Sequence, residues 1–148
     1  MHSSKTGLSV ADEKKYIGIL FFFFAVQIMS WVPRFPEIKA NLGLSNGEFG
    51  TYLSLGSVGA VVAMLSSGHL VHKYGAKRVL ILSTLSMCLS IGVIAHLQSA
   101  PVFIVINMIN GGAISAFNIA LNAQAFHAQD RAGELILSRQ HGYWTFLF

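Results

Sequence analysis

Four asparagines in one apolar stretch are the residues with the clearest chemical potential. They are Asn107, Asn110, Asn118 and Asn122. At about 100° per residue, a helix places them within an arc of roughly 120°. Because amides are costly in an apolar environment, this face should either line a polar cavity or bond to other helices. We favour cavity contact over interhelical bonding, since amides used only in packing need not follow the whole helix.

Three further side chains are candidates for the same cavity. Gln27 lies deep in the first apolar stretch, and Arg34 follows it on the same helical stripe. Arg34 could equally anchor that helix at a membrane surface. His141 opens the last apolar stretch, where it could exchange a proton or simply face lipid headgroups.

Other site chemistry is poorly supported by the sequence. His69 and His72 stand three residues apart, but two imidazoles fall short of a zinc site, and we expect neither a metal nor a cofactor. The sequence contains no phosphate-binding loop, no nucleophile elbow and no carboxylate pair within an apolar stretch. We therefore do not expect an enzyme.

The composition indicates a membrane protein. Of the 148 residues, 53% are hydrophobic and only 11% are charged, against about 25% charged in soluble domains. The mean hydropathy is +0.59. The net charge of +4 does not indicate a nucleic-acid partner, because the basic residues lie at the ends of apolar stretches and form no stripe. We expect an all-α membrane fold in contact with the lipid bilayer.

The apolar stretches predict four complete membrane spans and the start of a fifth. A complete span needs about 20 apolar residues. Residues 1–13 are expected to be a cytoplasmic tail, and residues 14–148 a membrane domain. The spans are expected at about residues 16–33, 48–71, 79–97 and 102–126, with an incomplete one at 135–148.

The connections carry local signals. Pro33 and Pro36 should break the first helix and leave an exterior loop that runs to Glu48. Ser45 followed three residues later by Glu48 is a capping-box pattern, which predicts a helix that begins near Asn46.

Small residues recur at every fourth position of the second span. The series are Gly56 and Ala60, and Gly59, Ala63 and Ser67. Such spacing lets two helices approach closely in lipid. We expect this face to be buried against another helix.

A short polar turn, residues 68–80, joins the second and third spans. It contains Lys73, Lys77 and Arg78 but no acidic residue, which places it on the cytoplasmic side by the positive-inside rule. Most other basic residues then fall on the same side, with Arg34 and Lys39 outside. The N-terminus is therefore expected in the cytoplasm, and the two joined helices should be antiparallel neighbours.

The last residues, 143–148, are apolar and carry no closing charge or cap. A span that stops partway cannot complete its helix. We expect a truncated or fragmentary chain that lacks the C-terminal half of a larger protein.

The polar turn resembles the signature loop between the second and third helices of the major facilitator superfamily. The residues that match are Gly68, Leu70, Lys73, Tyr74, Gly75, Lys77 and Arg78. His72 stands where the family has an acid, and Ala76 where it usually has a basic residue. Looser matches at residues 31–39, 42–45, 118–124 and 138–144 resemble a bacterial branch related to the fucose-permease-like transporters.

The resemblance implies a twelve-helix carrier built from two six-helix halves. Such a carrier moves a small solute by alternating access across the bacterial cytoplasmic membrane, with or without a coupling ion. Gln27 and the asparagine face would line the N-terminal half of its cavity. The loop residues would hold the cytoplasmic side of the cavity closed in the outward-facing state. This closure should be weakened here, because His72 lacks the fixed negative charge of the family's acid. The loop residues are Gly68, His72, Lys73, Gly75, Lys77 and Arg78. An alternative is a small four-helix membrane subunit or scaffold that binds a partner membrane protein through its small-residue face.

Overall fold

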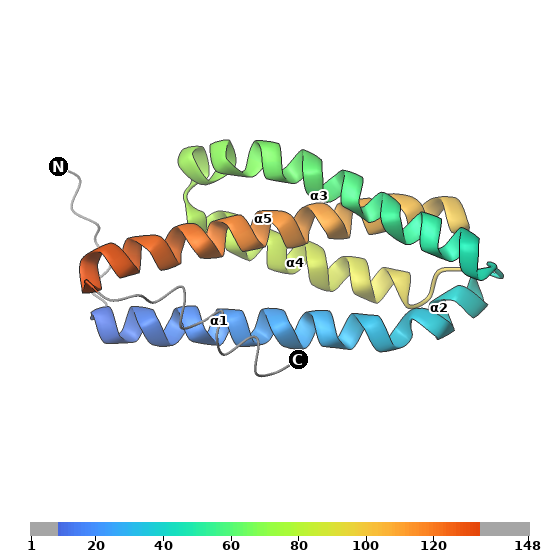
Figure 1. Cartoon of the computed structure of the whole chain (residues 1–148), viewed down its shortest axis with the longest axis horizontal. Coiled ribbons are helices and arrows are strands. Elements are labelled where there is room, and N and C mark those ends of the chain that lie inside the picture. The colour runs from blue at the N-terminus through green and yellow to red at the C-terminus, as the bar shows by residue number, and fades with distance from the viewer. Residues whose placement is uncertain (1–8, 134–148) are drawn as a thin grey trace.

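A computed structural model describes residues 9–133, which form an elongated bundle of long helices (Figure 1). Four helical stretches are long and apolar enough to cross a membrane, so the predicted all-α membrane fold is confirmed. The predicted fifth span lies outside the described residues. The elements are α1 (Val10–Trp31), the 3₁₀ turn η1 (Val32–Arg34), α2 (Phe35–Asn41), α3 (Asn46–Tyr74), α4 (Ala76–Ile94) and α5 (Ala100–Ala132).

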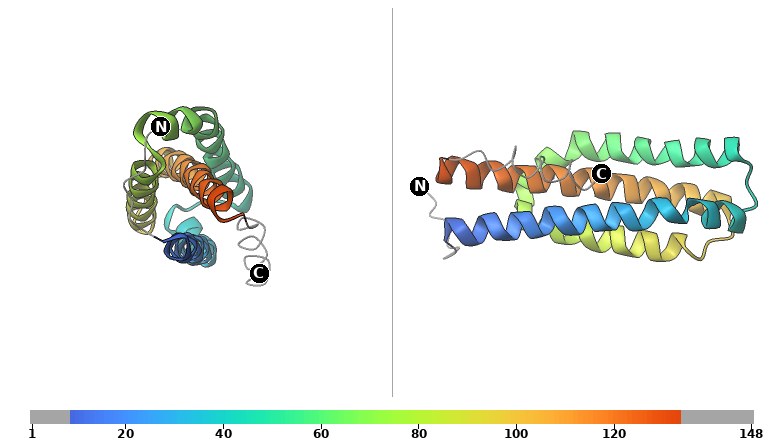
Figure 2. Two further views of the ribbon diagram at one scale, coloured as in Figure 1. Left: turned by 90° about the vertical axis from the view of Figure 1, so that its left-hand side faces the viewer. Right: turned by 60° about the horizontal axis from the view of Figure 1, so that its bottom comes forward.

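Helix α5 is the centre of the bundle. Helices α1, α3 and α4 all pack against it, and the end-on view shows them arranged around it (Figure 2). Helices α3 and α4 run in opposite directions, as expected, and are joined through Gly75, whose φ of 83° favours glycine. They contact each other much less than each contacts α5. The expectation that they pack as direct neighbours is therefore wrong along most of their length, because α5 lies between them.

The contact between α3 and α5 depends on glycine. A Cβ atom added to Gly59 would lie 1.9 Å from the carbonyl oxygen of Met108. A Cβ atom added to Gly111 would lie 2.2 Å from the carbonyl oxygen of Gly56. Ser67, further along α3, is also fully buried. The predicted burial of the small-residue face of α3 is thus confirmed, with α5 as its partner.

The segment after α1 departs from the predicted loop. The chain continues helically through η1 and α2, because Pro33 and Pro36 each occupy one of the first two positions of an element, where a missing N–H group is tolerated. Ile38 of α2 is buried in a cluster with Phe49 and Phe103. The two rings stack with centroids 5.8 Å apart. This cluster holds α2 against the ends of α3 and α5.

The predicted helix start at Asn46 is confirmed. Ser45 caps α3, and the side chain of Glu48 accepts from the backbone N–H of Ser45, which completes the capping box. Helix α1 begins at Val10, inside the segment expected to be a tail, because Ser9 caps it by accepting from the N–H of Asp12. The helices therefore extend past their apolar spans through polar first turns that side chains cap.

Candidate functional site

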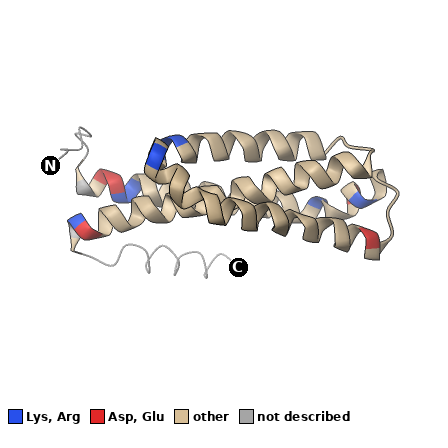
Figure 3. Ribbon diagram, turned by 90° about the horizontal axis from the view of Figure 1, so that it is seen from above, with Lys and Arg blue, Asp and Glu red and all other residues tan. Residues whose placement is uncertain are grey.

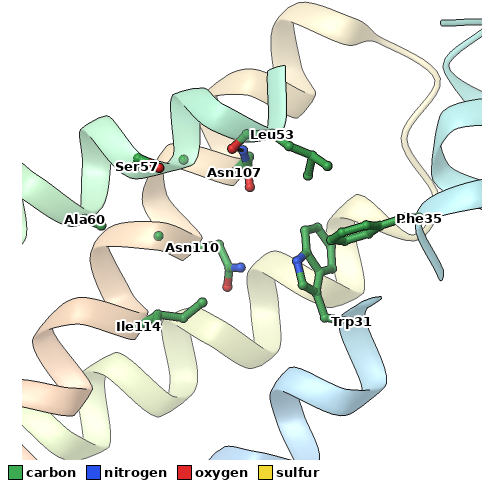
Figure 4. Close-up of a pocket in the computed structure, with 10 residues that line it drawn as sticks. Trp31, Phe35, Leu53, Ser57, Ala60, Asn107, Asn110 and Ile114 are labelled. Atoms are coloured by element: carbon green, nitrogen blue, oxygen red, sulfur yellow. Dashed lines mark hydrogen bonds between the residues drawn. The ribbon is translucent and has the colours of Figure 1, made fainter. Parts of the chain in front are cut away.

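An open cavity of about 330 Å³ lies where the end of α1 faces the first halves of α3 and α5 (Figure 4). Four elements form its three walls, because α1 and α2 share one of them. Trp31 and Phe35 form an aromatic wall, small residues of α3 form a second, and amides of α5 form the third. The lining residues are Trp31, Phe35, Leu53, Gly56, Ser57, Ala60, Asn107, Asn110, Gly111 and Ile114.

Asn107 joins α5 to α3. Its side chain is 5% exposed, and its Nδ2 donates to the carbonyl oxygens of Tyr52 at 3.0 Å and Leu53 at 3.1 Å. A Cβ atom on Gly56 would meet that Nδ2 at 2.9 Å, so the glycine makes room for the amide. Asn107 therefore lines the cavity and also acts as the interhelical bond that the sequence offered as the alternative.

Asn110 is in a different situation. Its side chain is only 2% exposed, and its Oδ1 has no hydrogen-bond partner among residues 9–133. The amide lies between α3 and the aromatic wall (Figure 4). A buried amide oxygen without a donor costs about 1–3 kcal/mol. Asn110 is therefore the polar group in this cavity that a ligand could satisfy.

The aromatic wall was not predicted as part of the site. Trp31 and Phe35 contact edge to face, with ring centroids 5.3 Å apart and planes at 88°. Neither residue was among the cavity candidates, and Phe35 falls in the segment that was expected to be an exterior loop. The spacing of four between Gln27, Trp31 and Phe35 is the signal that could have found them, had the helical phase been carried past Pro33.

The remaining cavity candidates lie outside this pocket. Gln27 is partly buried one turn before Trp31, and its Oε1 is buried without a partner among the described residues. Asn122 donates to Asn118 at 2.8 Å, on a part of α5 beyond the lining residues. Arg34 is exposed in η1. His141 lies outside the described residues.

The candidate gating loop is an exposed turn at one end of the bundle. Gly75 both ends α3 and precedes α4, and the Nζ of Lys73 lies 5.3 Å from the ring centroid of Tyr74. Gly68, His72, Lys77 and Arg78 are also exposed. At the same end, Arg131 of α5 forms an ion pair with Glu13 of α1.

Basic residues are unevenly divided between the two ends (Figure 3). The end with the α3–α4 turn has six of those described: Lys14, Lys15, Lys73, Lys77, Arg78 and Arg131. The opposite end has Arg34 and Lys39, together with Glu37 and Glu48. Among the described residues, no Lys, Arg, Asp or Glu lies in the middle of the bundle (Figure 3), as a hydrocarbon layer requires.

Comparison with known proteins gives consistent matches. The sequence model of one protein family, the Major Facilitator Superfamily, matches residues 17–131. The chain is 25% identical over 127 residues to an uncharacterised MFS-type transporter of Yersinia pestis, covering 86% of this chain and 33% of that protein. It is 22% identical over 125 residues to an uncharacterised transporter of Sinorhizobium fredii, and the match covers 84% of this chain and 33% of that protein. It is 23% identical over 126 residues to the membrane protein MosC of Rhizobium meliloti, and the match covers 85% of this chain and 31% of that protein.

The chain spans about a third of the length of the curated relatives it matches. No solved structure matches it. The family model covers most of the chain and includes the turn between α3 and α4. With four helices of membrane-spanning length, this chain is an integral, multi-pass membrane protein that belongs to the Major Facilitator Superfamily.

Proposed function

We propose that this chain forms the N-terminal part of a secondary carrier that moves a small polar solute across the bacterial cytoplasmic membrane by alternating access. Two of the relatives named above are described as transporters, and family membership supports the same role here. In this proposal the opposite wall of the solute cavity comes from helices beyond those described. The residue matches at 31–39 and 118–124 support a place in the branch related to fucose-permease-like transporters.

Asn110 carries the proposal. A carrier must bind its solute and release it again, so its contact groups must be left unpaired by the fold itself. The Oδ1 of Asn110 meets this condition, because it is buried beside an open cavity without a protein donor among the described residues. The aromatic wall formed by Trp31 and Phe35 adds an apolar surface on the other side. The described residues that line the cavity include no Lys, Arg, Asp or Glu, which favours an uncharged donor group on the solute.

The scaffold alternative loses its main support. It required the small-residue face of α3 to bind a helix of another protein. Gly56 and Gly59 on that face are already in contact with α5, and Ser67 is buried. The face is therefore occupied within this chain.

Uptake measurements test the proposal. The gene that encodes this chain is expressed in bacteria, and accumulation of a panel of labelled uncharged polar solutes is followed with and without Asn110→Leu. We expect accumulation of at least one solute to depend on the gene and to fall at least about tenfold in the variant, as loss of a buried hydrogen bond to the solute predicts. Asn41→Leu, the same change at an exposed site of α2, should leave uptake unaltered. Uptake that is independent of the gene, or insensitive to Asn110→Leu, would refute the proposal.

A further inference from the structure

The α3–α4 turn presents three cations without an acidic partner. Lys73, Lys77 and Arg78 are all exposed, and none of them forms an ion pair within residues 9–133. Residues 68–80 contain no Asp or Glu. At the same end of the bundle, Glu13 is already bound to Arg131. Asp12 and Asp130 also lie at this end, beside Glu13 and Arg131, but no described ion pair joins an acidic side chain to the three cations of the turn.

An exposed apolar surface begins one helical turn below these cations. On α4, Ile81 is 50% exposed and Leu82 is 66% exposed. Side chains three and four residues apart share a helix face, so these two lie directly below Lys77 and Arg78. The other face of the same stretch, which includes Val79 and Leu80, is buried in the bundle.

On α3, Lys73 stands in the same relation to Leu70, which is 37% exposed. Tyr74, 47% exposed, ends α3 beside Lys73, and aromatic residues favour the membrane interface. The turn thus combines positive charge at the level of the headgroups with an apolar surface at the level of the acyl chains.

We propose that this surface, Lys73, Lys77 and Arg78 above Leu70, Ile81 and Leu82, binds an anionic phospholipid of the surrounding leaflet. The phosphate and any further headgroup anion contact the three cations, and the acyl chains lie along the exposed face of α4. A soluble anion would use only the cations and gain nothing from the apolar residues. A nucleic acid has no acyl chain to cover them. The chemistry of the whole surface therefore matches a lipid, and the binding is independent of any transported solute.

The opposite end of the bundle provides a matched control. Arg34 and Lys39 are its described cations, and the Nζ of Lys39 donates to the Oδ1 of Asn46 at 2.6 Å. Glu37 and Glu48 at that end balance their charge. Removal of two cations there changes the net charge by the same amount as removal of two from the turn, but it should not change lipid selection.

Native mass spectrometry of the purified chain tests the proposal. The chain is released from detergent micelles that contain equal amounts of phosphatidylglycerol and phosphatidylcholine. We expect preferential retention of phosphatidylglycerol, reduced on the order of tenfold by the double substitution Lys77→Gln and Arg78→Gln, since each basic residue near a membrane surface contributes measurably to anionic lipid binding. The double substitution Arg34→Gln and Lys39→Gln should retain the preference.

Several outcomes would overturn the proposal. These are equal retention of the two lipids by the unaltered chain, equal loss in both double variants, and full displacement of the lipid by inorganic phosphate, which would indicate a simple anion site. If the Lys77→Gln and Arg78→Gln variant keeps its lipid preference and loses only its association with another protein segment, the cations form a protein contact instead.

A second measurement, on the unaltered chain, keeps the proposal testable even if the variant misfolds. Its preference for phosphatidylglycerol must weaken as salt is raised, and a preference that salt does not change would count against the inference.

Discussion

Asn107 and Asn110 lie three residues apart on α5, yet the fold uses their amides differently. The Nδ2 of Asn107 bonds to two backbone carbonyls of α3. The Oδ1 of Asn110 is buried without a partner in the described chain. The first amide stabilises the bundle, whereas the second costs free energy that a solute could recover. The same substitution should therefore have opposite effects on stability at the two sites.

Asn107→Leu should lower the free energy of unfolding by about 1 kcal/mol, within the range measured for interhelical hydrogen bonds in membrane proteins. Asn110→Leu should leave this free energy unchanged or raise it, because it removes a buried unpaired carbonyl. Unfolding of both variants in mixed micelles of increasing denaturing-detergent content checks the contrast. Equal destabilisation would mean that the fold itself uses the Asn110 amide.

On α5, Gly111 is the glycine at which the backbone contact with α3 leaves least room for added volume. Gly111→Ala places a methyl group 2.2 Å from the carbonyl oxygen of Gly56, so the helices must separate, at a cost of roughly 1–3 kcal/mol. Gly92→Ala is the control, because nothing lies within 4 Å of its added Cβ atom. The same unfolding assay should show a loss for Gly111→Ala and none for Gly92→Ala. Equal stability of the two variants would contradict the close packing.

At the scale of elements, the start of α3 depends on its capping box. Ser45→Ala removes the acceptor for the N–H of Glu48 and should cost about 1 kcal/mol. Hydrogen exchange of the amides of residues 46–49 should accelerate, because the first turn frays. Ser54→Ala is the matched control: its exposed hydroxyl only bonds back to the carbonyl of Gly50 within the helix. Equal acceleration in both variants would indicate that the cap does not hold the helix end.

The elements that the sequence predicts correctly are those set by local signals. The Ser45 cap and the small-residue spacing around Gly59 both depend on neighbouring residues or on one helix face. The continuation through Pro33 was missed because proline breaks a helix interior but is tolerated in a first turn. Which of these applies depends on whether Ile38 finds a core to bury in, and that is a tertiary property.

The candidate site shows the same division. Helical periodicity groups the four asparagines on one face, but it cannot tell which amide will find a partner. Asn107 bonds to α3, and Asn122 donates to Asn118. The Oδ1 atoms of Asn110 and Asn122 are both buried without a partner among the described residues, but of these two only Asn110 lines the cavity. The aromatic wall at Trp31 is equally beyond local signals, because it forms only when α1 and α2 are placed against α3 and α5.

At the scale of the whole molecule, the two ends of the bundle differ in charge. Six of the described basic residues lie at the end with the α3–α4 turn, and two lie at the other (Figure 3). Cytoplasmic loops carry the excess of Lys and Arg in membrane proteins. The charge asymmetry therefore favours an orientation with the turn and the start of α1 in the cytoplasm and α2 outside.

Labelling of single cysteines can establish this orientation. Cys88 is exposed, so it is first replaced by serine, and cysteine is then introduced at Asn41 in α2 or at His72 beside the turn, both exposed positions that leave every Lys and Arg in place. A membrane-impermeant maleimide should label Asn41→Cys in intact cells and His72→Cys only after the membrane is opened. The positive-inside rule predicts this order because moving the turn outward would carry three cations through the bilayer. The reverse order would place the basic turn outside, and labelling of both sites in intact cells would mean that the chain inserts in both orientations. Either result would also move the lipid-binding surface of α4 out of the leaflet in which we expect it.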